Sequence, residues 1–477
     1  MKPVGEIKKI VSLVDRGAFD EYVYPANAEL TVFQPQKPRA AYHNYTQETV
    51  TWPFTGHLSW GSRVTFDVPW PWQNDMLNWI ALRLKPASWL SQAALRHLGP
   101  DLADWVPLDP ANVWVWANSL GTTAIERAEM EVDGVIVEQF SGDWLNVWNK
   151  TMHSTTVGAA YDDAVYGSTY KTPTINNINV SDDGYVYCYL PFWFAKHVNT
   201  AYPLLSSKGP HSVRFHITLR PFRDVVRKLG NPRTSCDETP LGTTFKVRDY
   251  SFPFRKFKDV EVDPVVPGFM AADIVAGVSN IDGELRKAYI EAPHEILMEP
   301  VAEQIFAEPL KYTINKPDGN SINIGLPLSA ANGPLKQILF FLRRHNVSDF
   351  NDWNNYGAVA QPDPVWNPER PLLEHAQLMV GTAVWADQPE RWWRAAGNIT
   401  LPGGVRAYGN YIYAYNFAER PADFNPSGSL NASRADLRLN LRVAAPDGGA
   451  EWSVHVFLVG TNWIRFQNGL ANLLFMD

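Results

Sequence analysis

The chain has 477 residues, which is too long for one ordinary domain, so two or three domains are expected. Charged residues make up only 19% of it and the net charge is -8, which argues against a disordered chain and against a nucleic-acid binder with a basic surface. The 19 Trp, 19 Tyr, 23 Phe and 36 Pro favour short strands and turns over a helical protein.

The two cysteines, Cys188 and Cys236, are too few for a secreted disulfide scaffold, so folding in a reducing, cytosolic compartment is expected. Cys188 lies in an aromatic run and is expected to be a small buried apolar residue. No run of about 18 apolar residues is present, so no membrane-spanning helix is expected. The first nine residues lack the apolar core of a signal peptide.

Residues 1–25 are expected to form a separate N-terminal arm. Ile7, Ile10, Val11 and Val14 have the spacing of one face of a short amphipathic helix that would end near Gly17. That apolar face would have no partner within a β-sandwich.

Residues 26–222 show short strands separated by turns. The clearest strand lies in Ser212–Phe222, where apolar and polar residues alternate, and Asp133–Gly134 is a tight turn between two further strands. Residues 149–184 are polar and are expected to form a long exposed loop. Leu190–Phe194 is apolar and is followed and interrupted by prolines, so no helix is expected there. Strands are expected at Arg63–Val68, Asn112–Ala117, Ile125–Val132, Val135–Glu138 and Val213–Leu219.

Residues 223–240 read as a polar linker, after which the strand pattern starts again over residues 241–477. A second long polar loop is expected at 346–372. The two halves share one plan, which predicts two antiparallel sandwiches in tandem. Strands are expected at Ala288–Glu291, Glu295–Met298, Ser321–Leu326, Lys336–Arg343, Tyr411–Phe417, Leu437–Val443 and Trp452–Leu458.

No catalytic, cofactor-binding or metal-ligating residues are predicted. His294–Glu295 would begin a zinc helix, but Met298 stands where the second histidine is needed. The eleven histidines show no zinc spacing, and neither a nucleophile elbow nor a phosphate-binding loop is found. Asp133 and Asp183 each precede a glycine and are explained as turn residues rather than as a catalytic pair.

Six Asn-x-Ser/Thr sequons give possible glycosylation sites, although a chain folded in the cytosol would not meet the usual transferase. Asn149, Asn179 and Asn346 lie in or at the start of the two long polar loops and are the three candidates. The other three sequons begin at Asn44, Asn398 and Asn431.

Five segments, in order along nearly the whole chain, resemble the major capsid proteins of the nucleocytoplasmic large DNA viruses. The region Arg39–Tyr45 departs from the Arg-x-x-Thr-Asn-Phe block that the family often carries, and Ala432 replaces a frequent Phe, so the chain resembles a divergent member. The five segments are Leu13–Asp20 with Leu30–Phe33, Trp116–Glu126 with Asp133–Gly134 and Gly142–Leu145, Leu190–Phe194, Tyr411–Ala418, and the Pro-Ser-Gly turn and Asn-x-Ser-Arg signature in Asn425–Arg434.

The resemblance implies an all-β fold of two tandem eight-stranded antiparallel jelly-roll sandwiches. It implies a structural protein, not an enzyme, that forms homotrimeric, pseudo-hexagonal capsomers of an icosahedral shell. The expected partners are further copies of the chain, neighbouring capsomers, penton and minor capsid proteins, and an internal viral membrane near the basic N-terminal arm, with no direct nucleic-acid contact. The expected location is the virion capsid, after synthesis and folding in the host cytoplasm.

A jelly-roll carbohydrate-binding protein or glycoside hydrolase is the alternative. Such a protein would gather exposed Trp residues and a pair of carboxylates in one cleft. A capsomer would instead distribute its Trp residues through two cores and the subunit interfaces.

Overall fold

The computed structural model describes residues 45–474 except for 55–57, 71, 87–113, 166–184, 208, 230–253, 256–267, 282, 308–320, 361–368, 435 and 445–450. Met1–Tyr45 and Thr46–Asp477 form separate units. The expected arm, residues 1–25, and the candidate Asn179 lie outside the described residues. Among the described helices, none is long and apolar enough to span a membrane.

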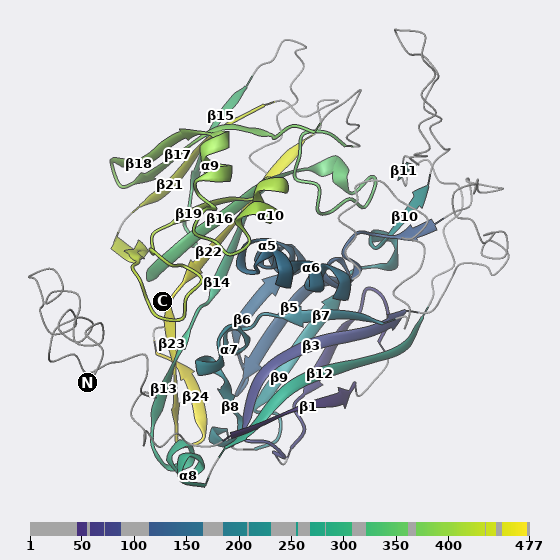
Figure 1. The fold of residues 1–477 in the computed structure, drawn as a ribbon, viewed down its shortest axis with the longest axis vertical. Helices are drawn as coiled ribbons and strands as arrows, with labels where there is room; N and C mark the ends of the chain where they lie inside the picture. Colours follow the sequence, from purple (N-terminus) through teal and green to yellow (C-terminus); the bar gives the residue numbers. More distant parts are fainter. Residues whose placement is uncertain are drawn as a thin grey trace, which may run out of the picture. The chain divides into compact units, whose positions relative to one another are not determined.

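The first sandwich consists of two antiparallel sheets that face each other (Figure 1). One sheet has the strand order β1 (Tyr45–Pro53), β12 (Phe269–Ile281), β3 (Met76–Pro86) and β7 (Val186–Leu190), with the short β8 (Tyr202–Pro203) beside β3. The other has the order β2 (Arg63–Asp67), β9 (Val213–Leu219), β5 (Ile125–Val132) and β6 (Val135–Ser141).

The second sandwich repeats this arrangement strand for strand. One sheet has the order β14 (Val301–Phe306), β22 (Trp452–Gly460), β16 (Pro334–Arg344) and β19 (Tyr413–Asn416), with the short β20 (Leu430–Asn431) beside β16. The other has the order β15 (Ile322–Pro327), β21 (Leu437–Val443), β17 (Leu373–Val380) and β18 (Ala383–Pro389). The shared plan predicted from the sequence is therefore visible in the sheet topology.

One strand crosses the expected division of the chain. β12 comes from the range assigned to the second sandwich, yet it pairs with β3 of the first, for example Ala276 with Ile80. In its sheet, β12 occupies the position that β22 occupies in the corresponding sheet of the second sandwich. The boundaries at 222 and 240 stay a prediction, because 230–253 lie outside the described residues, but the pairing places Phe269–Ile281 in the first sandwich.

The remaining described strands form two small sheets. β4 (Trp114–Trp116), β10 (Val226–Leu229) and β11 (Phe254–Arg255) form one. The other joins β13 (His294–Met298) to the C-terminal strands β23 (Asn462–Gln467) and β24 (Leu470–Leu473). This C-terminal sheet returns to the first sandwich, because the Ala471 amide donates to Asp133 and Phe466 meets Tyr202 edge to face.

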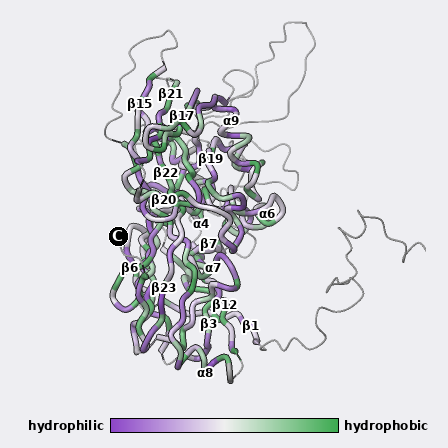
Figure 2. Tube along the Cα trace, turned by 90° about the vertical axis from the view of Figure 1, so that its left-hand side faces the viewer, coloured by the Kyte–Doolittle hydropathy of each residue, from purple (hydrophilic) through white to green (hydrophobic). Residues whose placement is uncertain are grey.

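Alternation of apolar residues produces both cores. In β9, Val213, Phe215, Ile217 and Leu219 are at most 1% exposed. His216 faces the other way, but it is also buried, since it bonds Glu131 and Thr65. Hydrophobic residues run along the strands of both sandwiches in Figure 2. The expected burial of Cys188 is confirmed.

Helices replace strand or loop at three places where the sequence predicted none. Residues 149–164, expected to be loop, contain the end of α5 (Gly142–Met152) and all of α6 (Thr155–Ala164), which are capped by Ser141 and Ser154. Ala288–Glu291, expected to be a strand, ends α8 (Gly283–Glu291). Trp193–Lys196 forms the single turn α7, because Pro191 lies before the helix and breaks none of its hydrogen bonds.

The remaining helical segments are short. They are α4 (Leu120–Thr123), α9 (Glu390–Ala395) and α10 (Gly404–Gly409), and the 3-10 turns η4 (Val198–Thr200), η5 (Leu204–Ser206), η6 (Phe222–Asp224), η9 (His345–Val347) and η10 (Ala432–Arg434).

Candidate functional site at the junction between the sandwiches

Helix α5 lies between the two sandwiches and is buried almost throughout. Its residues from Gly142 to Thr151 are all buried. Trp144 contacts Phe457 of β22 at 5.3 Å between ring centroids, and the Asn146 amide donates to the Tyr356 hydroxyl at 2.8 Å. Helix α5, which belongs to the first sandwich, therefore also packs against the core of the second sandwich.

Arg406 of α10 links the second sandwich to α5 and α6. Its guanidinium donates to the Asn149 carbonyl at 2.8 Å, the Gly158 carbonyl at 3.1 Å and the Asp162 carboxylate at 2.8 Å. Lys150 donates to both oxygens of Asp162. Burial lowers the pKa of Lys150, although Asp162 opposes this effect. One carboxylate thus compensates two buried cations.

A second charged cluster joins β16 and β22 to the start of α5. Arg343 donates to Asp143 at 2.6 Å and lies 3.3 Å from Nε2 of His455. Burial opposes ionisation of Asp143, but Arg343, His455 and Arg220 together outweigh it, and the pKa of Asp143 falls to about 2. Asp143, Glu303 and His455 offer three ligand atoms within 4.8 Å of one another, as in a metal site. The Arg343 guanidinium already contacts Asp143 and His455. It supplies the positive charge that a metal ion would otherwise bring to this cluster.

The described part of 346–372 packs into the junction rather than standing out as an exposed loop. The Asn351 amide donates to the carbonyls of Arg223 and Val226, both at 2.6 Å. The Trp353 indole donates to the Asp224 carbonyl at 2.8 Å. The prediction of two exposed loops is therefore wrong for residues 347–356, because their amide and indole groups satisfy backbone carbonyls of the first sandwich.

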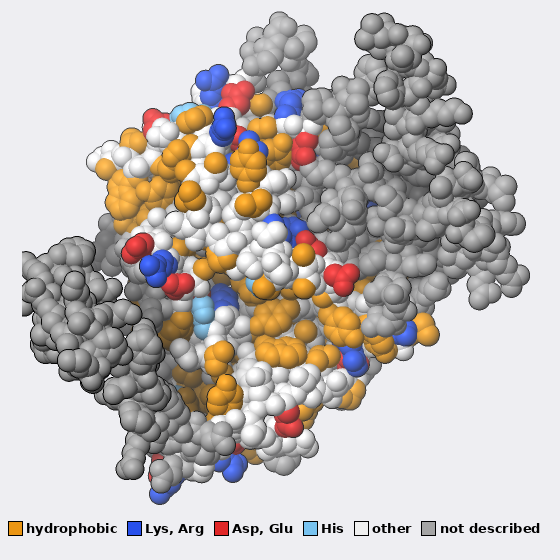
Figure 3. Space-filling model, in the orientation of Figure 1, with side chains coloured by type: hydrophobic (Ala, Val, Ile, Leu, Met, Phe, Trp, Pro, Cys, Tyr) orange, Lys and Arg blue, Asp and Glu red, His pale blue; other side chains and the backbone are white. Residues whose placement is uncertain are grey.

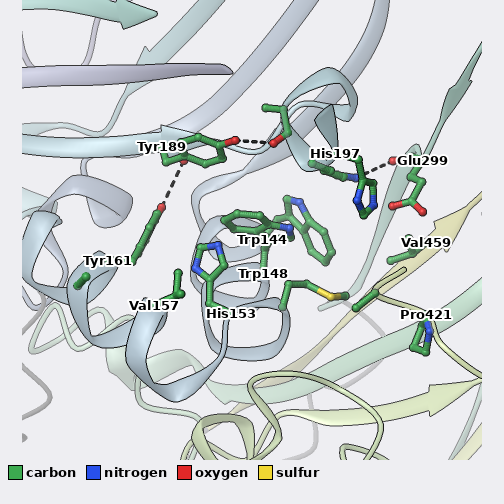
Figure 4. Close-up of a pocket in the computed structure, with 15 residues that line it drawn as sticks. Trp144, Trp148, His153, Val157, Tyr161, Tyr189, His197, Glu299, Pro421 and Val459 are labelled. Atoms are coloured by element: carbon green, nitrogen blue, oxygen red, sulfur yellow. Dashed lines mark hydrogen bonds between the residues drawn. The ribbon is translucent and has the colours of Figure 1, made fainter. Parts of the chain in front are cut away.

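A pocket of about 550 Å³ opens beside α5 and α6, with both sandwiches lining it (Figure 4). Its wall contains Trp148, Tyr161 and Tyr189 from the first sandwich and Val459 from the second. Trp148 stacks on Tyr189 at 5.7 Å. His153 also lines the pocket, and burial, with a contribution from Arg406, lowers its pKa to about 4. The pocket is thus aromatic, and its imidazole is neutral near pH 7.

This pocket lacks the chemistry of a glycosidase. Glu299 is the single carboxylate among its described lining residues, and it is paired with Lys336. Trp144 and Trp148 are 1% and 8% exposed, so neither offers an open ring face for a sugar. The fully buried Trp residues are divided between the two sandwiches rather than gathered at this pocket, as Trp193 and Trp393 show.

The buried carboxyl group of Glu138 in β6 makes the stability of the folded chain depend on pH. Its carboxylate is buried, accepts from the Trp193 amide at 2.7 Å and lies 3.9 Å from the Lys196 ammonium. Burial dominates and raises the pKa of Glu138 from 4.5 to about 7. A carboxyl group whose pKa is raised on folding stabilises the folded chain below the unfolded pKa, and this stability is lost as the pH rises through the folded pKa.

We therefore expect Glu138 to lower the melting temperature as the pH rises from about 4.5 to about 7, with no further effect above that, and Glu138→Gln to flatten that fall. Differential scanning fluorimetry of both proteins at each pH measures it. A Glu138→Gln variant whose melting temperature drops as steeply as that of the unmodified chain would contradict the prediction.

The three candidate glycosylation sites lie in different surroundings. Asn149 is 2% exposed and its amide donates to Asp162, so its nitrogen is not accessible in the folded chain. Asn346 is partly exposed and accepts from Arg344. Modification at Asn149, Asn179 and Asn346 stays a prediction. The sequence reasoning missed Arg406 and Arg343, because lone arginines carry no motif that predicts their partners.

Two sandwiches with the same strand order in a single chain define a double jelly-roll protein. Solved structures share this fold: the PBCV-1 virus capsid chain aligns with a TM-score of 0.65 at 14% identity, covering 94% of this chain and 100% of that one. The Faustovirus major capsid protein aligns with a TM-score of 0.63 at 12% identity, covering 97% of each chain.

Sequence comparison finds relatives among viral major capsid proteins. Residues 31–241 match the family described as "Major capsid protein N-terminus". The major capsid protein of Pyramimonas orientalis virus is 21% identical over 98% of this chain and 99% of its own length. That of Phaeocystis pouchetii virus is 22% identical over 98% and 99%. Over nearly its whole length, the chain is similar to these major capsid proteins of large DNA viruses, which are structural proteins of the virion capsid and not enzymes.

Proposed function

We propose that this chain forms a homotrimeric, pseudo-hexagonal capsomer of an icosahedral shell. The observation that carries the proposal is the repeated sandwich: two bodies with the same strand order lie side by side in one chain. Three copies give six such bodies, and a block with six similar sides tiles a flat facet with one gene product.

The junction supports this role because it fixes the two sandwiches to each other. Domains joined by a small polar interface usually move relative to one another. Here Arg406 and Arg343 each reach across the junction to buried carboxylates, and α5 is buried against both sandwiches. A capsomer that packs regularly against its neighbours requires two sandwiches in a fixed arrangement.

The mass of the purified protein in solution tests the proposal. We expect a species of about three times the 53.8 kDa chain mass, measured by light scattering after size exclusion, and a hexagonal outline by negative stain. A stable monomer at micromolar concentration, with no trimer in material taken from virus particles, would overturn it.

The further contacts expected from the family belong to the same proposal. Neighbouring capsomers, penton proteins and minor capsid proteins would border the trimer, and the arm of residues 1–25 would face the inside of the shell. The basic residues Lys2, Lys8 and Lys9 would suit that arm to the anionic surface of an internal membrane. Folding in the host cytoplasm, where thiols stay reduced, would suit the buried Cys188.

A further inference from the structure

The junction between the two sandwiches joins edge strands that are not equivalent to each other. Within the chain, edge strand β6 of the first sandwich contacts edge strand β14 of the second (Figure 1). In the repeated strand order, β6 corresponds to β18, and β14 corresponds to β1. The chain therefore uses one edge of each sandwich at the junction, and the two corresponding edges, β18 and β1, take no part in that contact.

The β5–β6 and β17–β18 hairpins correspond down to one irregularity. In each, the third residue of the second strand bulges out of the ladder: Val137 on β6 and Trp385 on β18. Val137 is 8% exposed, but Trp385 is 47% exposed. The same position is thus buried on the edge strand that lies at the junction and half exposed on the edge strand that lies outside it.

Other corresponding elements differ in burial in the same direction. Helices α5 and α9 each begin directly after the edge strand, β6 or β18. At the junction α5 is buried from Gly142 to Thr151, whereas α9 buries only Glu390 and Trp393. Strand β14 buries Val301 and Phe306 at its two ends, whereas no residue of β1 is buried. The elements that meet within the chain are covered, and their counterparts are open.

The open edge of the second sandwich is apolar. Val384 and Trp385 of β18 are 50% and 47% exposed. Figure 3 shows hydrophobic side chains gathered over the β17–β18 hairpin. Exposed edge strands of soluble proteins ordinarily carry charged side chains that keep other chains away. Because this one carries a Val and a Trp instead, it has the character of a contact surface.

We propose that β18 and α9 of one copy dock on β1 of a second copy, so that the junction inside each chain is repeated between chains. The inference rests on the proposed function, because it names the contact surface of the homotrimer. A contact between two unlike edges is head-to-tail, and contacts of this kind generate closed rings. The contact from β6 to β14 within each chain and the contact from β18 to β1 between chains would together join six sandwiches in a ring of three copies.

The internal repeat identifies a second copy as the occupant. Strand β1 has the same position in its sheet as β14, which is the strand that β6 contacts within the chain. A second copy covers both open edges through one type of contact, because each copy offers β18 to one neighbour and β1 to the other. A different protein bound to β18 would leave β1 open.

Photo-crosslinking of the purified trimer tests the proposal. Val384 is replaced by the photoreactive analogue p-benzoylphenylalanine, and the matched control carries the analogue at Ile136, the corresponding position on β6, which is 46% exposed. Irradiation of the Val384 variant is expected to give a product of twice the chain mass, in which mass spectrometry finds position 384 joined to β1. The Ile136 variant is expected to crosslink to β14 of its own chain and to keep the mass of a single chain.

Three results would overturn the proposal. The first is a trimer in which position 384 gives no product of doubled mass. The second is a crosslink from position 384 to a segment other than β1 or its neighbour β12. The third is a doubled mass from the Ile136 variant as well, because the two hairpins would then not be divided between an internal and an external contact.

A charge variant gives a second readout. Trp385→Glu is expected to shift the purified protein from trimer to monomer while its circular dichroism stays that of a β-protein, and the matched control Trp385→Phe is expected to stay trimeric. If the unmodified chain is itself a monomer, the proposed capsomer fails. If it is a trimer and Trp385→Glu forms an equally stable trimer, the capsomer stands and the assignment of β18 to the contact is wrong.

Discussion

Replacing Asp143 by alanine is expected to lower the free energy of unfolding by about 3–5 kcal/mol, because it leaves the Arg343 guanidinium buried without its carboxylate. The two side chains are only 9% and 12% exposed and are joined at 2.6 Å. The cost comes mainly from the uncompensated charge. Chemical denaturation of the unmodified and variant proteins, at one protein concentration, measures the difference.

The control is an exposed ion pair on the same chain. Glu295 and Arg465 are paired across β13 and β23, but their side chains are 38% and 47% exposed. Glu295→Ala is expected to cost about 0–1 kcal/mol, because water screens and replaces the pair. Equal losses for Asp143→Ala and Glu295→Ala would mean that the Asp143–Arg343 pair does not secure the junction.

Several strands of this protein follow from local sequence patterns, but β3, β12 and the positions of the helices do not. Leu437–Val443 was predicted with the bounds that β21 shows, because alternating apolar residues specify a half-buried strand. The stretch 149–164 was predicted to be loop because its Asn, Thr and Ser residues favour turns. Tertiary burial of Trp148 and Tyr161 overrides that preference, and the capping serines Ser141 and Ser154 were the available signal.

The junction itself could not be derived from the sequence. Arg406 and Asp162 are separated by 244 positions, and Arg343 and Asp143 by 200. No local sequence motif identifies these residues, because each pair forms only when the two sandwiches pack against each other. The burial of Cys188 within the run of alternating tyrosines was predictable, but which strands border β7 depends on the sheet order.

Gly158→Ala is expected to destabilise the protein by about 1–3 kcal/mol through overpacking, even though alanine is the better helix former. A Cβ at position 158 of α6 would overlap the Arg406 guanidinium, so the arginine would have to leave its place. The Gly158 carbonyl, the Asn149 carbonyl and Asp162 would each lose a hydrogen bond from Arg406. Asp162 would keep its pair with Lys150, which limits the loss.

A double-mutant cycle distinguishes the contact between Gly158 and Arg406 from a general intolerance of α6 to substitution. Arg406→Ala alone is expected to destabilise the protein, because it removes the three donations across the junction. Once Arg406 is absent, the added methyl group at position 158 has space, and the helix preference of alanine favours it by roughly 1 kcal/mol. Gly158→Ala should therefore be neutral or stabilising in the Arg406→Ala background and destabilising in the unmodified chain. Melting temperatures of the four proteins measure the coupling, and strictly additive effects would show that Gly158 is not required by the Arg406 contact.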